Sequence, residues 1–217
     1  MKYRAVLFDF DYTLGDATES ICEGYRNGLD RLGYPEPDRE AVRRTVGQTL
    51  ENGYTMLTGD ADPEHRRQFV LGFREVVNPA QQARLTRLFP GAAQLLETLH
   101  GHGVRTGVVT TKHSQTLRAV LERFQLLPVL DYTVGGEQVT ASKPAPEGLL
   151  RGMEHLGVAR AETLYCGDTT IDAETAKNAG VDFCAVLNGT TPAGAFEPYP
   201  AVHIAPDLVE LKDWLGI

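Results

Sequence analysis

The sequence predicts an α/β fold, a parallel sheet with helices on both faces, interrupted by an inserted all-helical segment. Three observations predict it. Short apolar runs alternate with segments of helical periodicity from about residue 88 to the C-terminus. The run Ala5–Phe8 is a further strand of the kind that is buried on both faces of a parallel sheet. Between these parts, residues 16–87 show helical spacing without a convincing strand.

The strand at Ala5–Phe8 is followed by a helix whose apolar side chains recur at Ile21, Tyr25, Leu29 and Leu32. Thr18 or Asp16 is its expected cap, and Gly33 its stop. Helical stretches are then expected at Asp38–Val46, at Leu50–Leu57 and from Asp62–Pro63 toward Val77, with Gly47 as a break. We therefore predict an α/β core of residues 1–15 and 88–217 and a helical cap of residues 16–87.

The second part of the core is expected to alternate regularly between strands and helices. Its strands are predicted at 104–110, 130–134, 163–166, 181–187 and 202–204. Helices are marked by Leu95, Leu96 and Leu99, by Leu117 to Phe124, by Leu149 to Leu156, by Asp172 to Ala179, and by Pro206 to Leu215. Right-handed crossovers between such strands give a Rossmann-like sheet.

The composition excludes several classes of protein. The 217 residues carry a formal net charge of -8, so we expect no nucleic-acid partner and no anionic membrane surface. No apolar run approaches the length of a membrane span. Three scattered cysteines suit a reducing compartment and predict no disulfide framework, so the expected location is the cytoplasm. We expect a monomer or a homodimer.

Chemically useful side chains follow several of the predicted strands. Asp9 and Asp11 come directly after the first strand, and Thr110 ends the second one, in VVTTK. Lys143 lies in SKPAP, and Asp168 and Asp172 lie four residues apart in GDTTID, directly after another strand. Taken singly, each has an ordinary structural alternative, such as a turn residue, a helix cap or a solvated lysine. Together they fall at the carboxyl edge of one sheet, where ligands bind in open α/β folds.

This set of motifs resembles the haloacid dehalogenase superfamily over nearly the whole chain. The four motifs are Asp9 to Leu14, Thr110, Lys143, and Asp168 with Asp172. The helical insertion, FPG at 89–91 and VGQTL at 46–50 resemble the helical-cap branch and, within it, phosphoglycolate phosphatase-like hydrolases. The resemblance implies a magnesium-dependent phosphatase that acts on a small phosphorylated metabolite.

The resemblance also implies roles for individual residues. Asp9 is the expected nucleophile and Asp11 the general acid and base. Thr110 is expected to donate to a phosphoryl oxygen, and Lys143 to neutralise developing charge. Mg²⁺ is expected to bind to the Asp9 carboxylate, the Asp11 backbone carbonyl and Asp168, with support from Asp172. The residues assigned to substrate binding are Thr13, Gly47, Gln48, Thr111 and Lys112.

Two positions depart from the family pattern. Residue 12, commonly glycine there, is Tyr12 here, which would be strained if the loop requires a positive φ. Residue 111, often asparagine in the phosphatase branch, is Thr111 here, and its shorter side chain is expected to alter contacts near the phosphate or substrate.

The same residues also discriminate between rival functions. The dehalogenases of this fold lack the second aspartate of the first motif, so Asp11 disfavours carbon–halogen hydrolysis. Phosphonate cleavage uses a cap lysine, and no lysine lies between Lys2 and Lys112. A phosphosugar mutase stays open as an alternative, because Arg43 and Arg44 could bind a second anionic group. A non-catalytic binding protein is disfavoured by the intact set of motifs.

Overall fold

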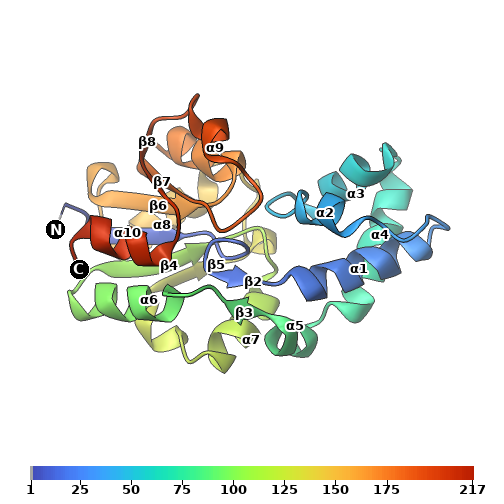
Figure 1. Cartoon of the computed structure of the whole chain (residues 1–217), viewed down its shortest axis with the longest axis horizontal. Coiled ribbons are helices and arrows are strands. Elements are labelled where there is room, and N and C mark those ends of the chain that lie inside the picture. The colour runs from blue at the N-terminus through green and yellow to red at the C-terminus, as the bar shows by residue number, and fades with distance from the viewer. Residues whose placement is uncertain (1) are drawn as a thin grey trace.

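Six parallel strands form the central sheet of the computed structural model, which describes residues 2–217 (Figure 1). Met1, where the predicted core range begins, lies outside the described residues. The strand order is β5-β4-β1-β6-β7-β8. The strands are β1 (Ala5–Phe8), β4 (Arg105–Val109), β5 (Tyr132–Val134), β6 (Thr163–Gly167), β7 (Asp182–Val186) and β8 (Ala201–Ala205). The predicted α/β fold is confirmed, and each predicted strand is present within two residues of its expected bounds.

Strand β1 lies near the middle of the sheet, between β4 and β6. Its side chains alternate between the two faces, because successive residues of a strand point in opposite directions. Val6 and Phe8 belong to the hydrophobic cluster on one face, and Leu7 belongs to the cluster on the other. All four residues of β1 are buried, which explains its unbroken apolar sequence. Asp9 therefore emerges from the centre of the carboxyl edge of the sheet.

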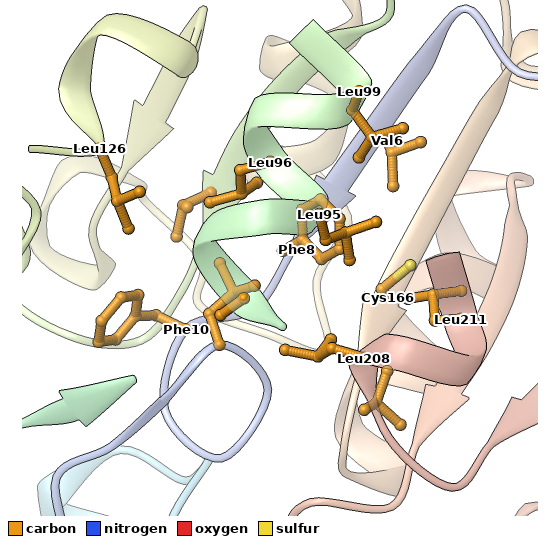
Figure 2. Close-up of a cluster of buried hydrophobic side chains, with 14 of the residues drawn as sticks. Val6, Phe8, Phe10, Leu95, Leu96, Leu99, Leu126, Cys166, Leu208 and Leu211 are labelled. Carbon is orange, nitrogen blue, oxygen red and sulfur yellow. The ribbon is translucent and has the colours of Figure 1, made fainter. Parts of the chain in front are cut away.

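Helices cover both faces of this sheet. One face packs against α6 (Ala92–Gly101), α7 (Ser114–Arg123) and α10 (Leu208–Leu215). Figure 2 shows leucines of α6 and α10 in the same hydrophobic cluster as Val6 and Phe8. The other face packs against α8 (Glu147–Leu156) and α9 (Thr170–Ala179). Among residues 2–217, no helix combines the length and the apolar character needed to cross a membrane.

A separate group of helices follows β1. It comprises α1 (Thr18–Asp30), α2 (Arg39–Arg43), α3 (Leu50–Thr58) and α4 (Pro63–Val76), which Figure 1 shows beside the sheet rather than on its faces. Its buried aromatic side chains, Tyr25, Tyr54, Phe69 and Phe73, pack in a hydrophobic cluster distinct from the two clusters of the sheet. This arrangement agrees with a cap, and the division at residues 15 and 88 stays a prediction.

Several boundaries in this region differ from those expected. The helix expected over 38–46 ends at Arg43, because both the N–H and the hydroxyl of Thr45 donate to Val42 O in a tight turn. A further helix, α5 (Pro79–Leu85), was not predicted. It begins with Asn78, whose side chain accepts from Gln81 N, followed by proline at the first helical position.

The chain passes between sheet and cap through a two-stranded antiparallel ribbon. Its strands are β2 (Gly15–Asp16) and β3 (Arg87–Leu88). Helix α5 packs against α7, and Arg123 of α7 donates to backbone carbonyl oxygens at the end of α5, including Thr86 O at 2.9 Å. The segment that leaves the cap is therefore attached to the core.

Candidate active site

The loop after β1 folds back tightly on itself. Asp9 N–H donates to Cys166 O of the neighbouring strand at 2.9 Å, which continues the sheet by one residue. Phe10 O then accepts from the N–H groups of Leu14 and Gly15 at 2.9 and 3.0 Å. Asp11 consequently lies on a short turn beyond the strand, displaced from Asp9 but still at the carboxyl edge of the sheet.

Tyr12 adopts the left-handed conformation, with φ of 62°. The strain expected of a residue with a side chain at this position is therefore present. The ring is buried, its hydroxyl lies 2.7 Å from Thr18 Oγ1, and Arg43 Nε donates to it at 3.3 Å. These contacts connect the turn that carries Asp11 to α1 and to the end of α2, and we infer that they offset the backbone strain.

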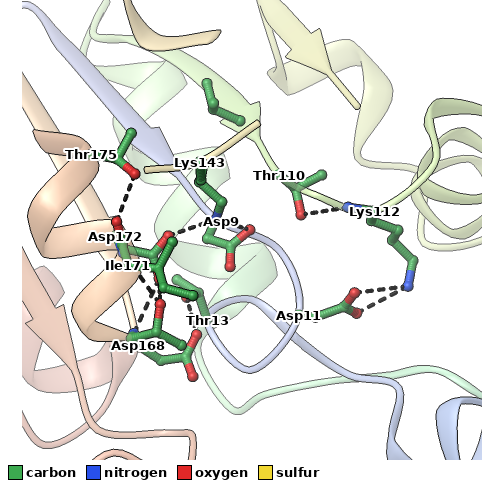
Figure 3. Close-up of polar contacts among 12 residues, drawn as sticks. Asp9, Asp11, Thr13, Thr110, Lys112, Lys143, Asp168, Ile171, Asp172 and Thr175 are labelled. Carbon is green, nitrogen blue, oxygen red and sulfur yellow. Dashed lines mark hydrogen bonds and ion pairs between the residues drawn. The ribbon is translucent and has the colours of Figure 1, made fainter. Parts of the chain in front are cut away.

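Three buried carboxylates converge at the edge of the sheet (Figure 3). Asp9 follows β1, Asp168 follows β6, and Asp172 lies in the first turn of α9. One oxygen of each lies within 4.8 Å of the others. The structure thus brings together Asp9 of the first predicted motif and both aspartates of the last one. Helix α9 begins at Thr170, two residues before the helix expected at Asp172 to Ala179.

Lys143 is the cation of this cluster. Its Nζ donates to Asp172 Oδ1 at 2.6 Å and lies 3.1 Å from Asp9 Oδ1, with only 4% of its side chain exposed. Burial alone would lower the pKa of Lys143, but Asp172 and Asp9 outweigh it and raise the pKa. The ammonium is therefore retained as a charged group beside Asp9.

Asp172 and Asp168 have different surroundings despite their shared motif. Asp172 Oδ1 accepts from Lys143 and from Tyr165 Oη at 3.1 Å, and its Oδ2 accepts from Thr169 N and Oγ1 at 3.1 and 2.6 Å. Asp168 Oδ1 accepts from Thr13 Oγ1 at 3.1 Å, whereas its Oδ2 is buried without a hydrogen bond. Asp172 thus positions Lys143, Tyr165 and Thr169. The Oδ2 atom of Asp168 stays available to bind a metal ion.

The cluster fits a divalent cation. Among residues 2–217, the buried side-chain oxygens that lack a hydrogen bond are Asp9 Oδ1, Asp168 Oδ2 and Tyr132 Oη, and two of these three lie here. Three carboxylates face one ammonium, so the buried charge is not balanced by protein groups. Burial raises the pKa of Asp9 to about 6 and that of Asp168 well above its usual range, with neighbouring carboxylates adding to the effect. Oxygen donors of this kind suit a hard ion such as Mg²⁺.

Gly189 leaves room for the free oxygen of Asp168. A Cβ at this position would lie 2.1 Å from Asp168 Oδ2. Asn188, beside it, donates through Nδ2 to Thr13 O at 3.0 Å. The loop after β7 therefore supports the cluster, a role that sequence patterns did not reveal.

Asp11 is held by a different lysine. Lys112 Nζ donates to Asp11 Oδ1 and Oδ2 at 3.0 and 3.1 Å, and both side chains are largely buried. Thr110 Oγ1 accepts from Lys112 N at 3.3 Å. Lys112, predicted to bind substrate, is thus placed to fix the orientation of the Asp11 carboxylate.

A cavity of about 430 Å³ opens beside Asp11, between the core and the helices of the cap. Four of the five residues assigned to substrate binding line it, namely Gly47, Gln48, Thr111 and Lys112. Thr13 does not line it and contacts Asp168 instead. Gly47 has a φ of 93°, and a Cβ there would lie 3.0 Å from Thr169 Cγ2, so the cap loop closely approaches the loop of the last motif.

Two further residues of the site, Tyr165 and Thr169, were not identified from the sequence. Tyr165 lies inside β6 and donates to both Val109 O and Asp172 Oδ1. The sequence pattern around Tyr165 indicates only a buried strand residue. Thr169 is the cap of α9 and exchanges hydrogen bonds with Asp172. The Thr-x-x-Asp spacing of a capping box was the signal that could have identified Thr169.

Comparison with known proteins gives consistent matches along the chain. A family model described as "Haloacid dehalogenase-like hydrolase" matches residues 6–186. The "Probable phosphatase IndB" of Dickeya dadantii (strain 3937) is 34% identical over 212 residues, which cover 94% of this chain and 91% of that protein. A phosphoglycolate phosphatase of Rhodospirillum rubrum is 32% identical over 231 residues, covering 98% and 91%.

Solved structures agree with these matches. A crystal structure from Bacteroides fragilis, described as that of a haloacid dehalogenase-like hydrolase, superposes with a TM-score of 0.92 at 38% identity. The superposition covers 97% of this chain and 100% of that one. The likeness therefore includes both the sheet and the helical insertion.

Proposed function

This chain belongs to the haloacid dehalogenase-like hydrolases, and we propose that it is a magnesium-dependent phosphatase that hydrolyses a small phosphomonoester through an aspartyl-phosphate on Asp9. One observation carries the proposal. The buried Asp9 carboxylate lies beside the Lys143 ammonium and Asp168, and both aspartates retain an oxygen without a hydrogen bond. The similarity to proteins named as phosphatases supports this choice of reaction.

In the proposed reaction, an Asp9 oxygen attacks phosphorus and the ester oxygen leaves. Lys143, held by Asp172, offsets the negative charge that would otherwise repel the phosphoryl group from Asp9. Asp11, held by Lys112, protonates the leaving alkoxide. It then takes a proton from the water that attacks phosphorus and releases Asp9. Thr110 donates its hydroxyl to a phosphoryl oxygen.

The proposed metal site uses a carboxylate oxygen of Asp9 and the unbonded Oδ2 of Asp168, together with the Asp11 backbone carbonyl. A bound Mg²⁺ supplies positive charge that neutralises the carboxylates and the phosphoryl oxygens. Asp172 is assigned a supporting role, because both of its oxygens already accept hydrogen bonds from protein groups.

Substrate choice is assigned to the cavity beside Asp11, because the core motifs contact only the phosphoryl group that all substrates share. Gln48 and Gly47 of the cap and Thr111 of the core are its proposed contacts. We further propose that the substrate is a small phosphorylated metabolite. The proposed location is the cytoplasm, and the proposed state is a monomer or a homodimer.

The mutase alternative gains no support from the two arginines on which it depended. Arg43 forms an ion pair with Glu40 at 3.0 Å and donates to Tyr12, and neither Arg43 nor Arg44 lines the cavity. We therefore do not propose a phosphosugar mutase.

Hydrolysis of p-nitrophenyl phosphate by the purified protein tests the proposal. We expect turnover with Mg²⁺, loss of turnover with excess EDTA, and recovery when Mg²⁺ is added back. Asp9→Asn should lower kcat by at least about 1,000-fold with an unchanged circular dichroism spectrum, because the amide is no nucleophile toward phosphorus. Full activity in EDTA, or an Asp9→Asn protein within tenfold of wild type, would contradict the proposal.

A further inference from the structure

Tyr12 lies next to Asp11 in an unfavourable backbone conformation. Within residues 2–217, Tyr12 and Gln125 are the two residues other than glycine with a positive φ. Gln125 is exposed and lies just after α7, where a left-handed residue commonly ends a helix. Tyr12 ends no helix, and only 2% of it is exposed. A bulky residue is seldom found in this conformation, which persists where the surrounding contacts hold it in place.

The side chain of Tyr12 is held at its hydroxyl group by α1 and α2. Its oxygen lies 2.7 Å from Thr18 Oγ1, in the first turn of α1, and accepts from Arg43 Nε at 3.3 Å. The Arg43 guanidinium also lies 5.6 Å from the centre of the Tyr12 ring, within the range of a cation–π contact. Thr18 N in turn donates to Asp16 Oδ1 at 2.9 Å. The ring therefore connects the turn after β1 to the start of α1 and to the end of α2.

The backbone of this turn is tightly bonded to itself. Tyr12 N donates to Gly15 O at 2.8 Å, and Phe10 O accepts from Gly15 N at 3.0 Å. Because consecutive Cα atoms are a fixed distance apart, a shift of the Tyr12 backbone also displaces Asp11. The Asp11 carboxylate is bound by Lys112 of the core at 3.0 Å, as Figure 3 shows. Its backbone position, in contrast, depends on how Tyr12 is anchored.

We propose that Tyr12 is a positioning residue for acid catalysis. Its side chain, anchored on Thr18 and Arg43, holds the turn in the conformation that presents the Asp11 carboxyl group to the leaving oxygen. The inference rests on the proposed phosphatase function. Because a misplacement of about 1 Å can lower a rate by about 100-fold, loosening this anchor should weaken the acid step selectively.

Two aryl phosphates of similar shape test the inference at saturating Mg²⁺. Phenyl phosphate has a more basic leaving group than p-nitrophenyl phosphate, so its cleavage depends more strongly on an acid. The value of kcat/KM reports the steps up to formation of the aspartyl-phosphate. Tyr12→Phe keeps the ring and removes the hydroxyl group. It should lower kcat/KM by about tenfold for phenyl phosphate and by less than about threefold for p-nitrophenyl phosphate.

Two arginines of α2 provide a matched pair of variants. Arg43→Gln removes the cation that donates to Tyr12, so it should change the ratio of the two kcat/KM values in the same direction as Tyr12→Phe. Arg39→Gln is the control, because Arg39 lies on the same helix but forms an ion pair with Glu19 on the surface. It should leave the ratio unchanged.

A double substitution separates positioning of Asp11 from a general structural effect. Asp11→Asn removes the acid, so adding Tyr12→Phe to it should lower kcat/KM for phenyl phosphate by less than about threefold further. If the two losses instead multiplied, Tyr12 would act independently of Asp11 and the inference would be wrong.

Amide hydrogen exchange over residues 10–15 gives a readout without substrate. Tyr12→Phe and Arg43→Gln should both speed exchange in this turn, as measured by mass spectrometry, whereas Arg39→Gln should not. Unchanged exchange in the first two variants, or equal losses of kcat/KM on the two esters, would overturn the inference. Failure of the phosphatase proposal has a separate signature, because the wild-type protein would then hydrolyse neither ester. The exchange measurement would still decide whether Tyr12 holds the turn.

Discussion

Two aspartates of one motif, four residues apart, have different surroundings. Asp172 is bonded on both oxygens by Lys143, Tyr165 and Thr169, so it positions the lysine. Asp168 has one oxygen free and buried. The spacing in the sequence predicted that both side chains face the site, but it could not say which oxygen stays unbonded, since that depends on residues from β6 and from the start of α9.

This difference predicts unequal effects on metal binding. Asp168→Ala should weaken Mg²⁺ binding by about 100-fold or more, because it removes a proposed ligand. Asp172→Ala should weaken it by about tenfold, because it removes a group that only supports the site. The measurement is the Mg²⁺ concentration that gives half-maximal hydrolysis of p-nitrophenyl phosphate. A larger effect of Asp172→Ala than of Asp168→Ala would mean that Asp172 is the ligand and Asp168 the supporting residue.

The pKa of Asp9 gives a second prediction at this scale. Burial raises this pKa from 3.8 to about 6 in the metal-free protein. A carboxyl group whose pKa is higher in the folded protein than in the unfolded chain stabilises the fold at low pH. This contribution is lost as the pH rises from about 3.8 to about 6. The pKa of Asp168 is also raised by burial, so Asp168 adds a loss of the same sign as the pH rises.

Mg²⁺ should reverse this loss by binding the ionised carboxylates. We therefore expect the rise in Tm on addition of Mg²⁺ to be larger at pH 8 than at pH 5, as measured by thermal unfolding at constant ionic strength. Asp168→Ala provides the control and should show a much smaller rise at pH 8. An equal rise at both pH values in the wild-type protein would show that the ion binds away from these carboxylates.

At the scale of elements, the cap loop at Gly47 lies close to Thr169 of the last motif. Its φ of 93° requires glycine, and its position against Thr169 leaves little space for a side chain. Gly59 offers a matched comparison, because its φ of 74° is also left-handed but no atom lies within 4 Å of the corresponding Cβ position.

Gly47→Ala and Gly59→Ala should therefore separate backbone strain from the contact with Thr169. Each should lower the free energy of unfolding by about 1–2 kcal/mol, as urea unfolding would show. Only Gly47→Ala should also lower kcat/KM for p-nitrophenyl phosphate, by about tenfold or more, because it displaces the loop beside the site. Equal activity in the two variants would mean that the approach of Gly47 to Thr169 has no part in the reaction.

The elements that the sequence did not predict are those with weak local signals. The ribbon of Gly15–Asp16 with Arg87–Leu88 has two residues in each strand, too few to show an alternating pattern. Helix α5 has a capping asparagine and a proline at its start but only seven residues, and its position depends on packing against α7. Long periodic helices such as α4 were predicted within one residue of their ends.

For the molecule as a whole, the order of strands and helices and most of the site could be predicted because the motifs follow successive strands of one sheet. The parallel sheet then brings Asp9, Lys143 and Asp168 together without further information. Contacts between distant segments could not be predicted in this way. The pairing of Lys112 with Asp11 and the contact of Arg43 with Tyr12 depend on side-chain directions and on how the cap lies over the sheet.

The most direct test of the central claim is detection of a phosphoryl group on Asp9 during turnover. The wild-type protein would be mixed with substrate and Mg²⁺, quenched rapidly in acid, digested and examined by mass spectrometry, with Asp9→Asn as the control. We predict a phosphoryl group on the peptide that contains Asp9, located at Asp9 itself and absent from the variant. Rapid hydrolysis without any phosphorylated peptide, or a phosphoryl group on a different residue, would contradict the account.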